Sequence, residues 1–336
     1  MSGGDLVITP CRLAVSVALT TLLLVPVTTA ASAAAPAQSA SDSPLYLDPS
    51  QPTDRRVEDL LARMTLEEKI GQMTQAERAS VFDDPSQIAQ LRLGSVLSGG
   101  GSTPPSNTPE AWVDMVNTFQ EQALSTRLGI PLIYGIDAVH GHGNVVGATV
   151  FPHNIGLGST RDARLIEEIG EATAAEVRAT GIPWSFSPCV CVTRDERWGR
   201  GYESFSENPQ LVDKLTSYIG GMQGRDLAGD DNVMATAKHY AGDGDTEFDE
   251  EVAQDNEGKP WFEQRYTIDQ GITVTSRPDF YRYDFSPYRL AIKREDVGAV
   301  MPSFSSIDWI EDGVGNPIKM HANQELITEV LKDQTG

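Results

Sequence analysis

Three polar clusters in this sequence contain the residue types that could bind or process a ligand. Residues 135–144 (GIDAVHGHGN) carry Asp137, and residues 238–246 (KHYAGDGDT) begin with a Lys-His pair. Residues 194–207 (RDERWGRGYESFSE) alternate arginines with carboxylates and add Trp198, Tyr202 and Phe205. Sugars are bound by planar donors and carboxylates at their hydroxyls and by flat apolar faces at their C–H surfaces. The three clusters together offer these groups.

Each cluster alone has a simpler interpretation. His140 and His142, two residues apart in a glycine-rich loop, are a weak metal signal because no third ligand lies nearby in the sequence. The arginine-rich segment could be a salt-bridged surface loop, and Lys238 with His239 could be a solvated pair. Whether the three clusters form one site therefore depends on whether the fold brings them close together.

Helical and strand-like patterns alternate along the chain. Hydrophobic spacing and capping residues predict helices, and Thr65 with Glu68 forms a capping box for the second of them. The predicted helices are 54–64, 66–73, 109–126, 161–180, 209–223, 283–293 and 322–332. Short apolar runs predict strands at 93–97, 131–136, 184–192, 233–237 and 298–303.

This alternation predicts an α/β fold with a parallel sheet, and the polar clusters favour a (β/α)8 TIM-like barrel. They follow several different strands, as active-site residues do in such barrels. A doubly wound sheet would place its site at one glycine-rich switch point, and Gly99–Gly101 is not followed by a phosphate-loop pattern. Only five or six strands are recognisable, so the barrel is expected to be incomplete at its C-terminal end.

Composition and the N-terminal segment predict a secreted protein. Arg12, a 15-residue apolar run (13–27) and the small residues around Ala33 are typical of a signal peptide, assigned to residues 1–33 with a linker at 34–52. The net charge of −22 argues against nucleic acid and anionic membranes as partners. No membrane association is expected after signal cleavage.

The cysteines suggest no metal site. Cys189 and Cys191 would point the same way from one strand, which is unfavourable for a disulfide between them. They also lack a second pair at zinc-site spacing. The expectation is two buried thiols, with no metal and no cofactor.

In their order and spacing the clusters resemble glycoside hydrolase family 3. FPHNIGLGST (151–160), VMPSFSS (300–306) and KMHAN (319–323) extend the resemblance over the predicted barrel domain, residues 53–336. It is similar to the β-glucosidase and exo-β-glucanase branch. The N-acetylglucosaminidase branch carries a histidine on the loop after its Lys-His motif, and residues 242–266 contain none.

The resemblance implies a metal-free, retaining hydrolase that removes terminal glucose from a β-glucan or β-glucoside oligosaccharide. Asp137, Arg200, Lys238 and His239 would bind the glucose ring, and Met301 would lie against it. The family's nucleophilic aspartate and acid/base glutamate correspond to positions beyond Gly336, so no catalytic residue is assigned and the chain alone is expected to be inactive.

Two other functions remain open. The chain could be a non-catalytic secreted sugar-binding protein, or a different barrel hydrolase that uses Asp243 or Asp245 as a base. The acidic segment 246–267 is expected to be a mobile excursion that could shape substrate choice.

Overall fold

The computed structural model describes residues 44–335, and the chain divides into two compact units between Leu60 and Leu61. The predicted signal peptide (1–33) and most of the predicted linker (34–43) lie outside the described residues. Within residues 44–335, no helix has both the length and the apolar character needed to cross a bilayer.

The first unit, described from residue 44, is a short turn followed by most of one helix. A 3-10 turn at Leu45–Leu47 precedes α1 (Thr53–Arg63). The backbone N–H of Tyr46 donates to Asp59 Oδ2 at 3.1 Å, which ties the turn to the helix.

The second unit begins with a helix whose start was predicted correctly. Thr65 caps α2 (Leu66–Gln72): its Oγ1 accepts from the Glu68 backbone at 3.2 Å. The Glu68 carboxylate accepts in turn from the Thr65 backbone at 2.8 Å. This reciprocal pair satisfies two N–H groups that a helix start leaves open.

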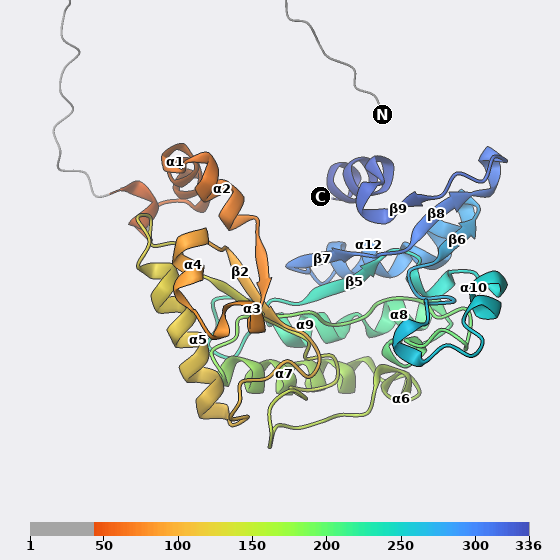
Figure 1. Ribbon diagram of the computed structural model, residues 1–336, viewed down its shortest axis with the longest axis horizontal. Coiled ribbons are helices and arrows are strands. Elements are labelled where there is room, and N and C mark those ends of the chain that lie inside the picture. Colours follow the sequence, from red (N-terminus) through yellow and green to blue (C-terminus); the bar gives the residue numbers. More distant parts are fainter. Residues whose placement is uncertain (1–43, 336) are drawn as a thin grey trace, which may run out of the picture. The chain divides into compact units, whose positions relative to one another are not determined.

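The main sheet is parallel and follows the order of the chain. β1 (Gln75–Glu77), β2 (Ser95–Ser98), β3 (Ile133–Ile136) and β4 (Trp184–Ser185) form one sheet in that order, and β5 (Thr236–Tyr240) pairs with β7 (Ala299–Pro302). Parallel bridges from Trp184 to Met234 and from Cys189 to Lys238 connect the two groups. Figure 1 shows β5 and β7 side by side, with α12 beside them.

A second small sheet contains β6 (Ile272–Thr275), β8 (Ser306–Trp309) and β9 (Ile318–Lys319). β6 and β8 are parallel, whereas β8 and β9 are antiparallel. In the described part of the chain β1 and β7 are the outer strands of the main sheet, so the strands form an open, TIM-barrel-like arrangement.

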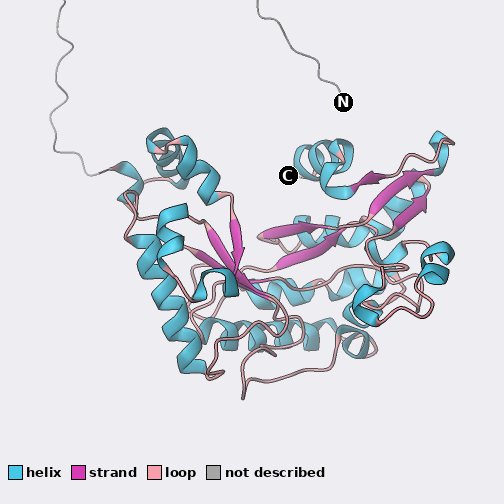
Figure 2. Cartoon of the chain, in the orientation of Figure 1, coloured by secondary structure: helices cyan, strands magenta, loops and turns pink. Residues whose placement is uncertain are grey.

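Helices and turns connect the strands, which are short segments between longer helices and loops (Figure 2). The remaining α-helices are α3 (Arg78–Phe82), α4 (Ser86–Leu91), α5 (Pro109–Leu124), α6 (Asn154–Gly158), α7 (Ala163–Ala179), α8 (Pro209–Leu215), α9 (Ser217–Gln223), α10 (Glu250–Asp255), α11 (Arg277–Asp279) and α12 (Ser286–Lys293). Two π-helical segments span Phe280–Asp284 and Glu325–Gln334.

Helices α7 and α9 pack unusually closely because glycines face one another. A Cβ atom on Gly221 would lie 2.0 Å from the Glu167 carbonyl oxygen, and one on Gly170 would lie 2.5 Å from the Tyr218 carbonyl oxygen. Neither helix could approach the other's backbone with a larger residue there. Figure 1 shows the two helices lying side by side.

The core continues from these helices into the strands. All five residues of β5 are buried, and β3 buries Tyr134 and Ile136 completely. The side chains at the ends of these two strands therefore stand on rigid backbone, which is the requirement for a precisely built site.

Several predicted elements differ from the structure. The predicted helix 283–293 corresponds to the end of the π-helical segment Phe280–Asp284 followed by α12, and the predicted helix 322–332 is π-helical from Glu325. The predicted strand 184–192 is regular only at β4, and the predicted helix 209–223 divides into α8 and α9 at Thr216. After Ser185 the segment has no regular strand pairing and keeps a single bridge, from Cys189 to Lys238 of β5.

The prediction of two free thiols was also wrong. Cys189 and Cys191 form a disulfide, and both are buried. The alternation of a regular strand would have kept their side chains parallel, but this segment is irregular and its Cα atoms are 5.4 Å apart, within the range that a disulfide spans.

Candidate functional site

A pocket of about 260 Å³ lies where the carboxyl ends of β3 and β5 meet the long loop after β4. Asp137 follows β3, Lys238 lies in β5, and Arg200 comes from the loop. The pocket-lining residues are Gly100, Asp137, Val139, His140, Gly141, Gly143, Asn144, His153, Arg200, Tyr202, Glu203 and Lys238. The three clusters from the sequence therefore converge at one place.

Lys238 and Asp137 form the central ion pair of this pocket. Lys238 Nζ donates to Asp137 Oδ1 at 2.8 Å, and the lysine side chain is only 4 % exposed. The Asp137 side chain is 29 % exposed, and its Oδ2 has no hydrogen-bond partner within residues 44–335. That oxygen is left as an acceptor for a ligand hydroxyl.

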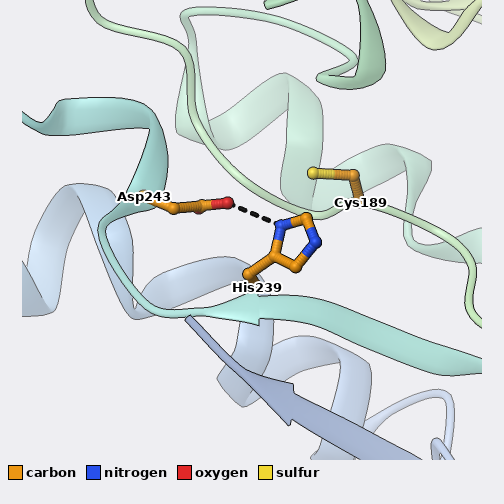
Figure 3. A group of neighbouring side chains, drawn as sticks. All are labelled: Cys189, His239 and Asp243. Carbon is orange, nitrogen blue, oxygen red and sulfur yellow. Dashed lines mark hydrogen bonds and ion pairs between the residues drawn. The ribbon is translucent and has the colours of Figure 1, made fainter. Parts of the chain in front are cut away.

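A second polar chain runs from Glu203 to Asp243. Glu203 accepts two hydrogen bonds from Arg200, at 2.7 and 3.1 Å, and Arg200 also contacts His239 Nε2 at 3.0 Å. Because a guanidinium only donates, Nε2 must accept, so the proton of the imidazole is on Nδ1. Nδ1 donates to Asp243 Oδ2 at 2.7 Å, as Figure 3 shows.

The pair of Arg200 and Glu203 in this hydrogen-bonded series sets the protonation of both groups beside the pocket. Burial alone would raise the pKa of the Glu203 carboxyl, but the hydrogen bonds and charge of Arg200 lower it below its ordinary value. Burial likewise opposes the Arg200 charge, yet Glu203 raises the pKa of that guanidinium above its ordinary value. Both groups therefore remain ionised, and Glu203 is unsuited to donate a proton at neutral pH.

Three rings form one wall of the pocket. The centroids of His140 and His153 are 3.8 Å apart, and Tyr202 meets His153 edge-on at 4.5 Å. Burial, and then the neighbouring His140, lower the pKa of the His153 imidazole. A neutral ring there offers an uncharged, flat face to a ligand.

Asn144 connects the glycine loop after β2 to this wall. Its Nδ2 donates to the Gly99 carbonyl at 3.1 Å, and its Oδ1 accepts from the Gly101 N–H at 3.0 Å. Gly100, between the two, lines the pocket. The loop that the sequence offered as a weak phosphate loop instead forms part of the pocket rim.

The histidines do not converge on a metal site. His140 Nδ1 donates to the Phe151 carbonyl at 2.6 Å, whereas His142 is buried and bonds Thr180 through Nε2 at 2.9 Å. Potential ligand atoms of Cys189, His239 and Asp243 do lie within 4.8 Å of one another (Figure 3). The Cys189 sulfur, however, is in the disulfide and is not a thiolate, the form that binds metals.

The structure brings most of the predicted site residues together. Asp137, Arg200 and Lys238 line the pocket, and His239 contacts Arg200. Met301, on β7, is in register with Lys238 but does not line the pocket.

The two proposed alternative bases are placed differently from these residues. Asp243 accepts from His239 through Oδ2 and does not line the pocket. Asp245 lies 3.8 Å from Arg194 and does not line the pocket.

Sequence reasoning did not single out Glu203, His153 and Asn144, although all three lie within the motifs that it used. The signal for Glu203 was available, because a carboxylate three residues after Arg200 lies within reach of it in a helical turn such as Gly201–Glu203. The placement of His153 depends on how 151–160 folds back toward the pocket, which no spacing indicates.

Comparison with known proteins shows the same family over most of the chain. Residues 65–336 match the sequence model described as "Glycosyl hydrolase family 3 N terminal domain". The chain is 29 % identical to a lysosomal beta glucosidase of Dictyostelium discoideum over 84 % of its length, and 30 % identical to Beta-glucosidase C of Emericella nidulans over 87 %. It spans only 34 % and 46 % of those relatives' own lengths.

A solved structure agrees with these matches. The exo-1,3/1,4-beta-glucanase of a Pseudoalteromonas species superposes with a TM-score of 0.71 at 38 % identity, covering 84 % of this chain and 33 % of that one. The TIM-barrel-like arrangement of the second unit is therefore one that is also found in a solved glucanase.

Proposed function

The chain belongs to glycosyl hydrolase family 3, and on that premise we propose that it forms the glucose-binding part of a secreted β-glucosidase or exo-β-glucanase. The substrate would be a β-glucan or β-glucoside oligosaccharide with a terminal glucose. Relatives named as beta-glucosidases and as an exo-1,3/1,4-beta-glucanase support this substrate class.

The paired contacts Lys238–Asp137 and Arg200–His239 carry this proposal. They place a carboxylate, an ammonium and a guanidinium around a pocket of about 260 Å³, just below the size range of pockets for drug-sized ligands. Asp137 Oδ2 would accept from a sugar hydroxyl, and Lys238 would donate to one. The rings of His140, His153 and Tyr202 would face the C–H surface.

We further propose that the groups which cleave the bond are not among the residues that line this pocket. Retaining cleavage needs a nucleophilic carboxylate and an acid/base carboxyl about 5–5.5 Å apart. Of the lining carboxylates, Asp137 is paired with Lys238, and Glu203 is held ionised by Arg200. The pocket as described can bind and orient a glucose ring, but both of its lining carboxylates are paired with cations.

Calorimetric titration of the 336-residue chain with glucose tests the binding site. We expect the wild type to bind glucose and Asp137→Asn to weaken binding at least about tenfold, because it removes one charged hydrogen-bond acceptor. Asp195→Asn is the matched control, since Asp195 is likewise paired with a cationic side chain, Arg197 at 2.6 Å, but does not line the pocket. Equal loss of affinity in both variants, or no binding by the wild type, would refute the site.

Release of nitrophenol from an aryl β-glucoside tests the proposal that the groups which cleave the bond are not among the lining residues. We expect binding of the glucoside without turnover by this chain. Robust turnover would show that a nucleophile and an acid are present after all. The alternative, a non-catalytic sugar-binding protein, is distinguished by reading the coding sequence beyond the Gly336 codon.

A further inference from the structure

A second, larger pocket of about 610 Å³ adjoins the first. Arg200, Tyr202 and Glu203 line both pockets, so the two form a continuous surface. The other residues that line the second pocket are Arg197, Gly199, Asn256, Trp261, Gln264, Arg265, Tyr266, Thr267, Ile268, Asp269, Gln270 and Phe304.

Large aromatic rings are exposed at this second pocket. Trp261 is 83 % exposed, Tyr266 68 % and Phe304 65 %. Clusters of exposed rings are uncommon on a soluble surface unless they bind something. Amide and charged groups line the same pocket, including Gln264, Gln270 and Asp269.

The segment that presents Trp261 and Tyr266 is internally braced. Asn256 donates through Nδ2 to the Arg265 carbonyl at 2.7 Å and accepts from its N–H at 2.9 Å. Gln264 Nε2 donates to the Lys259 carbonyl at 2.9 Å, and the Asp249 N–H donates to the Thr267 carbonyl at 2.8 Å. These bonds brace the aromatic turn, within a segment that the sequence analysis expected to be a mobile excursion and that contains α10 and a 3-10 turn at Trp261–Glu263. A turn braced in this way lowers the entropic cost of binding.

We propose that Trp261 and Tyr266 form a binding site for the glucose units that follow the terminal one, so that the chain recognises an oligosaccharide rather than a single sugar. This proposal rests on the proposed function, because the first pocket would hold the terminal ring. The rings would stack on the C–H faces of the next units, and the amide groups of the same pocket would bond hydroxyls.

A β-linked glucan suits this surface better than a protein partner does. The polar groups of the pocket match the many hydroxyls of a sugar chain, whereas the core of a protein interface is depleted of charged residues. Continuity with the first pocket through Arg200 and Tyr202 gives the chain of sugars a single path.

Binding by ligands of two lengths tests the proposal. The affinity of the 336-residue chain is measured for glucose and for the β-1,3- and β-1,4-linked glucose tetramers. We expect at least one tetramer to bind more tightly than glucose, and Trp261→Ala to weaken tetramer binding about tenfold while glucose binding stays within about twofold. Tyr266→Ala should act in the same direction.

Phe262→Ala is the matched control. Phe262 is 68 % exposed and meets Trp261 edge-on at 5.8 Å, yet it does not line the pocket, so neither ligand should be affected. Melting temperatures of all variants are compared to confirm that each is folded.

The outcomes separate this site from the glucose site. If glucose binds but no tetramer binds more tightly, or if Trp261→Ala leaves tetramer affinity unchanged, the further site is refuted and the glucose pocket stands. If a tetramer binds in a Trp261-dependent way while glucose does not, the further site is supported and the glucose pocket is refuted. Absence of all binding refutes both, and a Trp261-dependent self-association with unchanged tetramer affinity refutes the sugar assignment.

Discussion

Glu203 keeps Arg200 in position, so we expect its replacement to lower both the stability of the fold and the affinity for glucose. The Glu203 side chain is 7 % exposed and Arg200 31 %, so little water is available to replace the pair. We predict that Glu203→Gln lowers the free energy of unfolding by about 2 kcal/mol, because a mostly buried guanidinium loses its charged partner. Glucose affinity should fall as Arg200 shifts.

Urea denaturation and calorimetry measure the two effects. The control is Glu168→Gln, whose pair with Arg164 is exposed on both sides, with side chains 49 % and 78 % accessible. Exposed pairs contribute at most about 1 kcal/mol, and often much less. Similar destabilisation by the two variants would contradict the role given to Glu203.

His142 should make the fold sensitive to acid. Burial lowers the pKa of its imidazole from 6.5 to about 4. Because the pKa of His142 is lower in the folded state, the unfolded state binds more protons between pH 6.5 and 4. The folded state therefore has its full stability above pH 6.5 and loses stability as the pH falls toward 4. The difference is worth roughly 3 kcal/mol. We predict that His142→Gln flattens this part of the stability curve.

The measurement is the free energy of unfolding from about pH 4 to about pH 8 in both proteins. Burial raises the pKa of Asp245 to about 6 and raises that of Asp284, so these carboxyls act in the opposite direction and reduce stability as the pH rises from about 4. They are present in both proteins, so the difference between the two curves isolates His142. Parallel curves would exclude His142 as the sensor.

At the scale of elements, local signals identified the starts of several helices. Thr65 with Glu68 located α2, and Pro109, following the cap residue Thr108, located α5, because capping depends on residues only a few positions apart. Helix α7 starts at Ala163 rather than 161, since Asp162 is its cap and Arg161 has a positive φ of 55°. Such boundaries are set locally and can be predicted to within a few residues.

Strands were harder to predict because whether a segment forms a strand depends on the strands with which it pairs. In β6, Thr273 and Thr275 are buried while Ile272 and Val274 are more exposed, which reverses the usual alternation. β1 has the sequence Gln-Ala-Glu and is a strand only because it pairs with β2. The disulfide between Cys189 and Cys191 escaped prediction for a similar reason: the irregular backbone there is set by contacts with β5.

Some features of the candidate site could be predicted from the sequence, and others depend on contacts between distant segments. Asp137 and Lys238 were predictable because each directly follows a strand that the sequence predicts, 131–136 and 233–237, although Lys238 lies within β5 in the structure. The hydrogen bond from Arg200 to His239 joins two separate segments, the loop after β4 and strand β5, and His239 then donates to Asp243, four residues further along the chain. Which nitrogen of His239 accepts follows only from those contacts, so the sequence could name the residues but not their states.

At the scale of the whole molecule, the charge of −22 should oppose folding through mutual repulsion of surface carboxylates. The Debye length falls from about 30 Å at 0.01 M salt to about 10 Å at 0.1 M, so added salt screens this repulsion. We predict that raising NaCl from about 10 to about 300 mM increases the melting temperature by about 2 °C or more.

Glucose affinity is the internal control, because the ligand is neutral and the Lys238–Asp137 pair is shielded, with the lysine 4 % exposed. A melting temperature that falls across this range would mean that surface ion pairs, rather than net repulsion, dominate the electrostatics of the fold.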